Sequence, residues 1–126
     1  MDTPVSPIAL VQQAITGGTL GQILWNDRAD ECVRSNPDLQ GFTPEAIRRL
    51  LHDFGSSGGR VDERRESRPD WLQANAGRPA YYRDWWFRAV IPIAGVFPKG
   101  LFVEMRLFDD DPDDPWVEIV NAHPQV

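Results

Sequence analysis

Two stretches decide the fold: WWFRAVIPI at residues 85–93 and LFVEMRLF at residues 101–108. Apolar residues fill every second position of each stretch, which is the pattern of a β-strand with one buried face. A third strand is expected at 116–122, because it follows the acidic turn from Asp109 to Pro115 as the second arm of an antiparallel hairpin. The positions expected on the buried face are Phe87, Ala89, Ile91 and Ile93 in the first stretch, and Leu101, Val103, Met105 and Leu107 in the second.

The first half of the chain predicts helices at residues 7–16, 20–35 and 44–54. The first has Ser6 as N-cap and proline at the next position, and Gly17-Gly18 ends it. An apolar stripe from Leu20 to Val33 indicates the second, which must end before the proline at position 37. Thr43 caps the third, and its apolar residues fall on one face.

Residues 60–66 are almost entirely charged, so a strand there is expected at a sheet edge. Residues 67–84 are expected to form a long connection with one helical turn near Trp71. Helices followed by strands predict an α+β fold, in which N-terminal helices pack on one face of a small curved antiparallel sheet formed by the C-terminal half. At 126 residues we expect one domain spanning 1–126.

Composition indicates an ordinary globular protein. Cys32 is the only cysteine, which excludes an intramolecular disulfide and favours a reducing compartment. The first 18 residues lack a basic region and have only a short apolar stretch broken by Gln12 and Gln13, so they predict neither a signal peptide nor a membrane span. We therefore expect a cytoplasmic protein without membrane attachment.

The formal net charge is −6, which argues against nucleic acid as a partner. The charge is uneven, however: residues 109–118 hold six acids and no base, whereas residues 48–88 hold nine arginines and six acids. Twelve of the thirteen cations are arginine, the side chain that grips phosphate through paired hydrogen bonds. A genome rich in G and C explains that composition equally well.

The strand pattern places Arg88, Glu104, Arg106 and Glu118 on the face away from the core, beside Trp86 and Phe102. Two arginines, two carboxylates and two aromatic rings on an uncovered sheet can hold a phosphate, stack a base and move a proton. The alternative interpretation is cross-strand ion pairing on a solvated face.

The two histidines of the chain are expected to have different roles. His123 follows the third strand and can act as a general acid near neutral pH, although simple alternation puts it on the core face unless a bulge reverses it. His52 falls on the polar side of its helix and is expected to be solvated. Two distant histidines and one cysteine do not predict a metal site. The run from Asp109 to Asp114 lacks the ligand spacing of a calcium loop, so we interpret it as a solvated turn.

The order of elements resembles the RelE-like toxin fold, the group of small metal-independent RNases that includes barnase-like and MqsR-like proteins. Two regions carry the resemblance: residues 41–51 with the charged strand 59–66, and the strands 86–93, 101–108 and 116–120 ending in His123. Such proteins work on an open sheet face with arginines plus a histidine, glutamate, tyrosine or lysine. Arg88, Glu104, Arg106 and His123 match that pattern here.

The resemblance implies cleavage of RNA by attack of a 2′-hydroxyl on its own phosphate, without metal or cofactor. Glu104 or Glu118 would accept the hydroxyl proton, and His123 would protonate the leaving oxygen. Arg88 and Arg106 would hold the phosphate, with Trp86 and Phe102 beside it. An inhibitory protein partner, as in toxin-antitoxin systems, is also implied.

The acidic composition and the extra N-terminal helices depart from that pattern. They favour an alternative: a non-enzymatic, acidic protein-interaction module, immunity- or antitoxin-like. In that hypothesis the acidic turn and exposed aromatic rings dock onto a basic partner.

Overall fold

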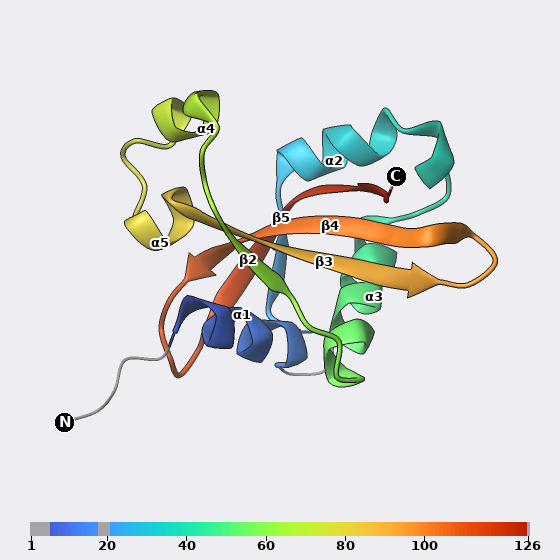
Figure 1. Cartoon of the computed structure of the whole chain (residues 1–126), viewed down its shortest axis with the longest axis horizontal. Coiled ribbons are helices and arrows are strands. Elements are labelled where there is room, and N and C mark those ends of the chain that lie inside the picture. The colour runs from blue at the N-terminus through green and yellow to red at the C-terminus, as the bar shows by residue number, and fades with distance from the viewer. Residues whose placement is uncertain (1–5, 18–20, 126) are drawn as a thin grey trace.

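The computed structural model describes residues 6–17 and 21–125 (Figure 1). Its helices and strands follow in this order: α1 (Pro7–Thr16), β1 (Ile23–Trp25), α2 (Asp27–Arg34), the short 3-10 helix η1 (Pro37–Leu39), α3 (Pro44–Ser56), β2 (Asp62–Arg65), α4 (Pro69–Ala74), α5 (Ala80–Arg83), β3 (Trp85–Ile93), β4 (Phe97–Asp109) and β5 (Trp116–Pro124). The α+β fold class is confirmed.

The strands form one sheet in the order β1-β5-β4-β3-β2. β2, β3, β4 and β5 pair antiparallel, as predicted for the last three, and the charged β2 lies at an edge. β1 was not expected: it pairs with β5 in parallel, with Ile23 opposite Val117. The sheet is therefore mixed and takes one strand from the first quarter of the chain.

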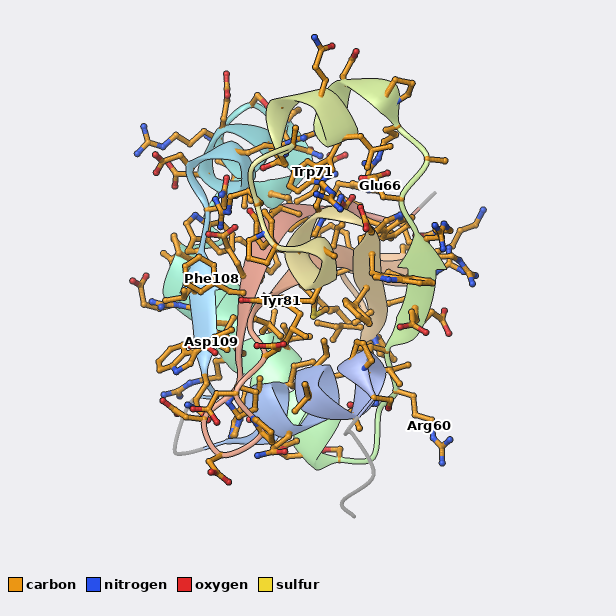
Figure 2. The ribbon with its side chains drawn as sticks, turned by 90° about the vertical axis from the view of Figure 1, so that its left-hand side faces the viewer. Arg60, Glu66, Trp71, Tyr81, Phe108 and Asp109 are labelled. Atoms are coloured by element: carbon orange, nitrogen blue, oxygen red, sulfur yellow. The ribbon has the colours of Figure 1, made fainter. Side chains whose placement is uncertain are left out.

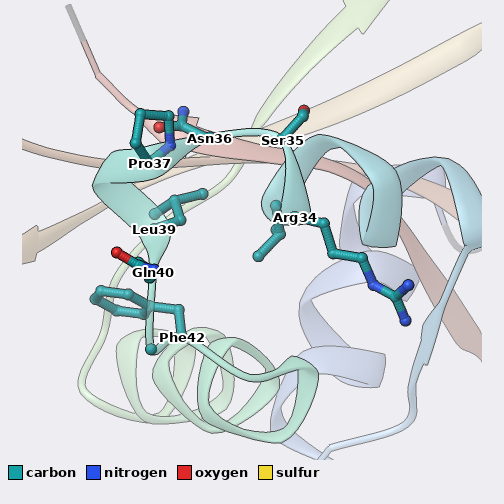
Figure 3. Close-up of a pocket in the computed structure, with 9 residues that line it drawn as sticks. Arg34, Ser35, Asn36, Pro37, Leu39, Gln40 and Phe42 are labelled. Carbon is teal, nitrogen blue, oxygen red and sulfur yellow. The ribbon is translucent and has the colours of Figure 1, made fainter.

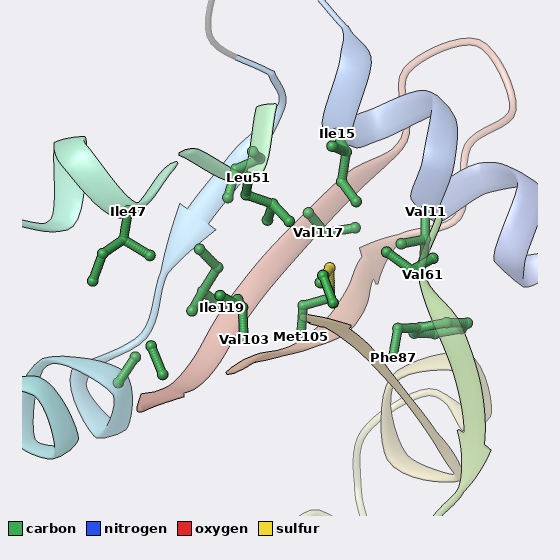
Figure 4. Packing of buried hydrophobic residues seen from close by; sticks show 14 of the residues in the cluster. Val11, Ile15, Ile47, Leu51, Val61, Phe87, Val103, Met105, Val117 and Ile119 are labelled. Carbon is green, nitrogen blue, oxygen red and sulfur yellow. The ribbon is translucent and has the colours of Figure 1, made fainter. Parts of the chain in front are cut away.

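The main core lies between the sheet and the helices α1 and α3, and residues of α2 and η1 (Ala29, Val33 and Leu39) belong to the same cluster (Figure 4). The alternation in β3 and β4 is confirmed, because Phe87, Val103 and Met105 have no exposed surface. From the helices Ile15, Ile47 and Leu51 pack into the same cluster, equally buried. This is the face against which the helix at 44–54 was predicted to lie.

Local signals explain α1 and α3. The Ser6 hydroxyl accepts a hydrogen bond from the backbone N–H of Ala9, and the Thr43 hydroxyl accepts one from Ala46. Each cap is followed by proline in the first helical turn, where a missing N–H costs nothing. Both predicted helices are confirmed, although α3 runs two residues beyond the expected end.

The predicted helix at 20–35 is wrong in its first half; its first position lies outside the described residues. Residues 23–25 form β1 instead, and α2 begins only at Asp27. The Asn26 side chain accepts a hydrogen bond from the backbone N–H of Arg28 at 2.7 Å, which starts a new helix there. Ile23 faces the core in either structure, so its apolar character did not distinguish strand from helix.

His52 is not solvated as expected. Its ring is half-buried, and Nδ1 lies 2.8 Å from the main-chain carbonyl of Ile15 near the end of α1. The contact ties α3 to α1. In the described part of the chain no helix has the length and apolar character needed to cross a bilayer.

Candidate functional site

The strand register brings the predicted charged residues together on the sheet face opposite the main core. Arg88 of β3 lies opposite Glu104 of β4, and Arg106 of β4 lies opposite Glu118 of β5. Trp86 belongs to the same face of β3. The sequence pattern therefore identified side chains that are neighbours in space.

The expectation that this face is uncovered is wrong for its central residues. The segment from residue 67 to 84, with α4 and α5, lies over them (Figures 1 and 2). The Trp71 ring centre lies 3.8 Å from the Arg106 guanidinium carbon, a cation–π contact. Arg106 has no exposed surface and Glu104 only 4%. A phosphate outside the protein has no access to either side chain in this structure.

Arg106 makes most of its hydrogen bonds through its two Nη groups inside the protein, whereas its buried Nε has no partner among the described residues. Its Nη1 donates to the main-chain carbonyls of Tyr82, Arg83 and Trp85, at 3.3, 3.3 and 2.8 Å. These carbonyls belong to the end of the covering segment and the start of β3. Arg106 thus fastens the cover to the sheet.

Four charged side chains form an ion cluster, defined here as Glu66, Arg68, Glu104 and Arg106; three of them are buried, and the Arg68 side chain is 42% exposed. Arg106 Nη2 pairs with Glu66 Oε1 and lies 3.8 Å from Glu104 Oε2. Arg68 bridges the two carboxylates, with Nε 3.0 Å from Glu66 Oε2 and Nη2 2.9 Å from Glu104 Oε2. Two positive and two negative charges cancel, so the cluster meets the need of buried charge for partners.

Glu66, like Arg68, is a member of the cluster that the sequence analysis missed. It comes directly after the charged β2, where it reads as one more solvated acid. Its Oε2 also accepts hydrogen bonds from the backbone N–H groups of Ser67 and Arg68, at 2.9 and 3.1 Å. Burial raises the pKa of Glu66, but the hydrogen bonds from Arg68 and Arg106 outweigh it and lower the pKa from 4.5 to about 2.

Glu118 is half-buried and lies outside this cluster. Its Oε1 accepts a hydrogen bond from the Tyr82 hydroxyl at 2.6 Å and another from the Asn26 side-chain amide at 3.1 Å. Burial, then the hydrogen bond to Glu118, raises the pKa of Tyr82. The carboxylate thus joins the covering segment to the turn before α2.

A bulge in β5 decides where His123 points. Glu104 lies opposite Asn121 and Met105 opposite Ile119, so Val120 is an extra residue. The alternation reverses there, and His123 lies opposite Phe102, with the two rings stacked at 4.6 Å. The bulge therefore moves His123 off the core face on which plain alternation placed it.

Part of the predicted face remains accessible, and we call it the open strip: Trp86, Arg88, Val90, Phe102 and His123. All five are half-buried or exposed. Arg88 Nε lies 3.2 Å from Asp62 Oδ2 across the β2–β3 pair. His123 Nδ1 lies 2.9 Å from the main-chain carbonyl of Pro124, which leaves Nε2 outside that contact. The open strip offers stacking surfaces, one paired arginine and one imidazole.

A second surface, the acidic end, consists of Phe108, Tyr81 and the turn of residues 109–114 (Figure 2). Every residue of the turn is exposed, and Phe108 is 39% exposed. The turn is nevertheless held: the Gln13 side chain donates to the Pro112 carbonyl at 2.9 Å, and the Gln22 side chain donates to Asp114. Burial, followed by the charges of Asp110 and Asp109, raises the pKa of Tyr81.

A hollow of about 460 Å³ lies at the end of α2 (Figure 3). It has little capacity for chemistry. The Arg34 guanidinium at its wall pairs with Asp30 at 2.9 Å, and the Asn36 side chain accepts from the backbone N–H of Asp38. Within the described residues no group of three or more His, Cys, Asp or Glu side chains is placed to hold a metal ion. The residues lining the hollow are Val33, Arg34, Ser35, Asn36, Pro37, Leu39, Gln40, Gly41 and Phe42.

The arrangement therefore separates the predicted site into parts. Glu104 and Arg106 lie in the ion cluster, and Glu118 holds the cover. Trp86, Arg88, Phe102 and His123 lie in the open strip. The resemblance to RelE-like toxins stays a prediction drawn from the sequence alone. Comparison of the chain with protein-family models, with curated proteins and with solved structures gives no match.

Proposed function

We propose that the protein is a non-enzymatic interaction module of the immunity or antitoxin type, which binds a basic protein partner through its acidic end. The observation that carries this proposal is the exposed, tethered turn of residues 109–114 beside the rings of Phe108 and Tyr81. Carboxylates steer a basic partner toward the surface, and aromatic rings supply the apolar contacts on which affinity usually depends.

The tethering of the turn supports this role. The Asp109 and Asp111 side chains accept hydrogen bonds from the backbone N–H groups of Asp111 and Asp113, at 3.0 and 2.9 Å. Together with the two glutamine contacts, these bonds hold the carboxylates in place before a partner arrives. Less conformational entropy is then lost on binding.

The ion cluster weighs against the catalytic alternative. Metal-independent cleavage of RNA needs cations that meet the phosphate as charge develops. Arg106, the residue expected at the centre of that contact, is instead neutralised by Glu66 and covered by Trp71.

The test compares the parent with Asp109→Asn/Asp110→Asn/Asp111→Asn and with Phe108→Ser, using a purified basic protein captured by the parent. The triple variant is expected to associate about tenfold more slowly at low salt, and the difference should shrink as salt rises. Phe108→Ser is expected to dissociate faster, with an unchanged salt dependence. Asp38→Asn, in the distant η1, serves as control. Equal association rates for the parent and the triple variant would overturn the proposal.

The open strip favours a second candidate, RNA binding with cleavage by His123. The supporting observation is the Phe102–His123 stack at 4.6 Å, because stacked rings on a sheet face hold bases without regard to sequence. Under this candidate Arg88→Ala and Phe102→Ala each weaken RNA binding at low salt, and His123→Ala abolishes cleavage and also weakens binding, because it removes one ring of the stack. A parent protein that neither binds nor cuts RNA at low salt eliminates this candidate.

A further inference from the structure

Three hollows adjoin one another along the side of the molecule where α1, α3 and the turn before β2 meet. Their volumes are about 510, 440 and 420 Å³. The first and second share Gly58 and Gly59, and the second and third share Gln12 and Arg60. Neighbouring hollows share wall residues, so the three lie side by side from β3 to the start of α1, and we call this row the groove.

The two ends of this groove are apolar. At one end Leu50 and Phe54 of α3 face Ile91 and Pro92 of β3. At the other end the walls are Ile8 and Ala9 of α1 with Val61, and the rim carries Asp62. Each end can accept one apolar side chain of a bound segment.

The middle of the groove is polar and has unused hydrogen-bonding groups. Among the described residues, the Gln12 side-chain amide and the Arg60 guanidinium have no hydrogen bond or ion pair, although both border two hollows. Figure 2 shows the Arg60 side chain extending away from the body of the protein. A side-chain amide can pair with the N–H and C=O of a peptide backbone, and a guanidinium pairs best with a carboxylate.

We propose that this groove binds an extended peptide segment of a partner protein, with an acidic residue opposite Arg60 between two apolar side chains. The apolar ends take the two apolar residues, Gln12 holds the peptide backbone, and Arg60 selects the carboxylate. Nucleic acid is disfavoured as occupant, because one arginine between two apolar ends does not follow a phosphate backbone. The surface is separate from the acidic end, and it selects a carboxylate at the one position of the peptide that faces Arg60.

A charged residue at the first end of the groove restricts which peptide sequences can bind. Asp53 of α3 is exposed there, and no ion pair to its carboxylate is found among the described residues. A peptide carboxylate beside Asp53 would be repelled by it, and binding would be weaker. The peptide therefore carries a neutral or basic residue beside its first apolar anchor and its acidic residue further along.

The test begins with a display library of random peptides of about ten residues, long enough to span the groove in extended form. Selection on the immobilised parent is expected to enrich sequences with an acidic residue between two apolar ones. The best synthetic peptide is then measured by fluorescence anisotropy against Arg60→Glu and Arg49→Glu. Arg49 is the matched control, because it is exposed on α3 and lines none of these hollows.

Arg60→Glu is expected to weaken binding about tenfold or more, whereas Arg49→Glu leaves it unchanged. A peptide with lysine in place of its acidic residue should bind Arg60→Glu better than it binds the parent. This charge reversal separates recognition from any loss of folding. Selection that enriches no peptide, or equal effects of the two arginine variants, would overturn the proposal.

Discussion

Glu66 shows how one side chain depends on its surroundings for both charge and position. Its carboxylate is buried, and it accepts hydrogen bonds from Arg68 and Arg106 as well as from two backbone N–H groups. Removal of one member of a buried charge cluster leaves its partners unpaired, which costs more than the cluster itself contributes. The stability of the protein should therefore respond to this residue more than to any exposed acid.

We expect Glu66→Gln to lower the free energy of unfolding by about 3 kcal/mol at pH 7. The folded pKa of Glu66, about 2, lies below its ordinary value of 4.5, so ionisation stabilises the fold above pH 4.5. This stabilisation is lost as pH falls from 4.5 toward 2. The difference between parent and variant, measured by urea unfolding, should therefore be smaller at pH 3 than at pH 7. Glu63→Gln, on the preceding edge strand β2, should show little difference at either pH.

Val103→Ala tests the main core in the same assay. Val103 is fully buried in β4, so removing its two methyl groups loses apolar burial and leaves a cavity. The expected loss is about 2 kcal/mol in the free energy of unfolding. Asp110→Ala, in the exposed turn, should change it by less than about 0.5 kcal/mol. Equal losses in the two variants would contradict the assignment of the core.

At the scale of elements, the covering segment 67–84 has a loop-like sequence, yet it packs against the sheet as a second layer. Trp71 and Tyr82 anchor it in a small second cluster with Val120 of β5. Tyr82 adds the hydrogen bond to Glu118, and Trp71 lies against Arg106. Two short helices of this kind gain their order from these contacts more than from helix propensity.

Tyr82→Phe should lower the free energy of unfolding by about 1 to 2 kcal/mol, because it leaves the half-buried Glu118 carboxylate with one donor fewer. Tyr81→Phe is the matched control: it is the neighbouring tyrosine, and its hydroxyl has no hydrogen bond among the described residues. Thermal unfolding followed by circular dichroism distinguishes the two variants. A larger effect at Tyr81 would show that the Tyr82 hydroxyl does not hold the cover.

The elements that the sequence predicted are those with strong local signals. The alternation of β3 and β4 and the proline-following caps of α1 and α3 need no knowledge of the rest of the chain. β1 is three residues long and its partner β5 lies at the other end of the sequence, so no local pattern marks it. The cover was missed because residues 67–84 have two prolines, one glycine and no regular apolar spacing, while Trp71 and Tyr82 reveal their role only against the sheet. Hence the site residues were placed on one face correctly, but their burial was not foreseen.

At the scale of the whole molecule, charge is divided between separate surfaces. The acidic end carries exposed carboxylates, the ion cluster cancels its charges internally, and the groove presents Arg60. The net charge of −6 is therefore a poor guide to the charge of any one of these surfaces. Long-range attraction of a basic partner depends on the acidic end, and it should be weakened by salt far more than peptide binding in the groove.

The position of β5 also constrains how the protein is made. β5 follows the other described strands in the chain, yet it lies between β4 and β1, which precedes them all. Until residues 116–124 emerge, β1 has no strand partner and the β4 edge stays open to other chains. A purified chain truncated after residue 115 should therefore remain sensitive to protease around β1, and a chain that includes residues 116–125 should be protected there. Protection already present at residue 115 would mean that the helices alone can hold the N-terminal region in place.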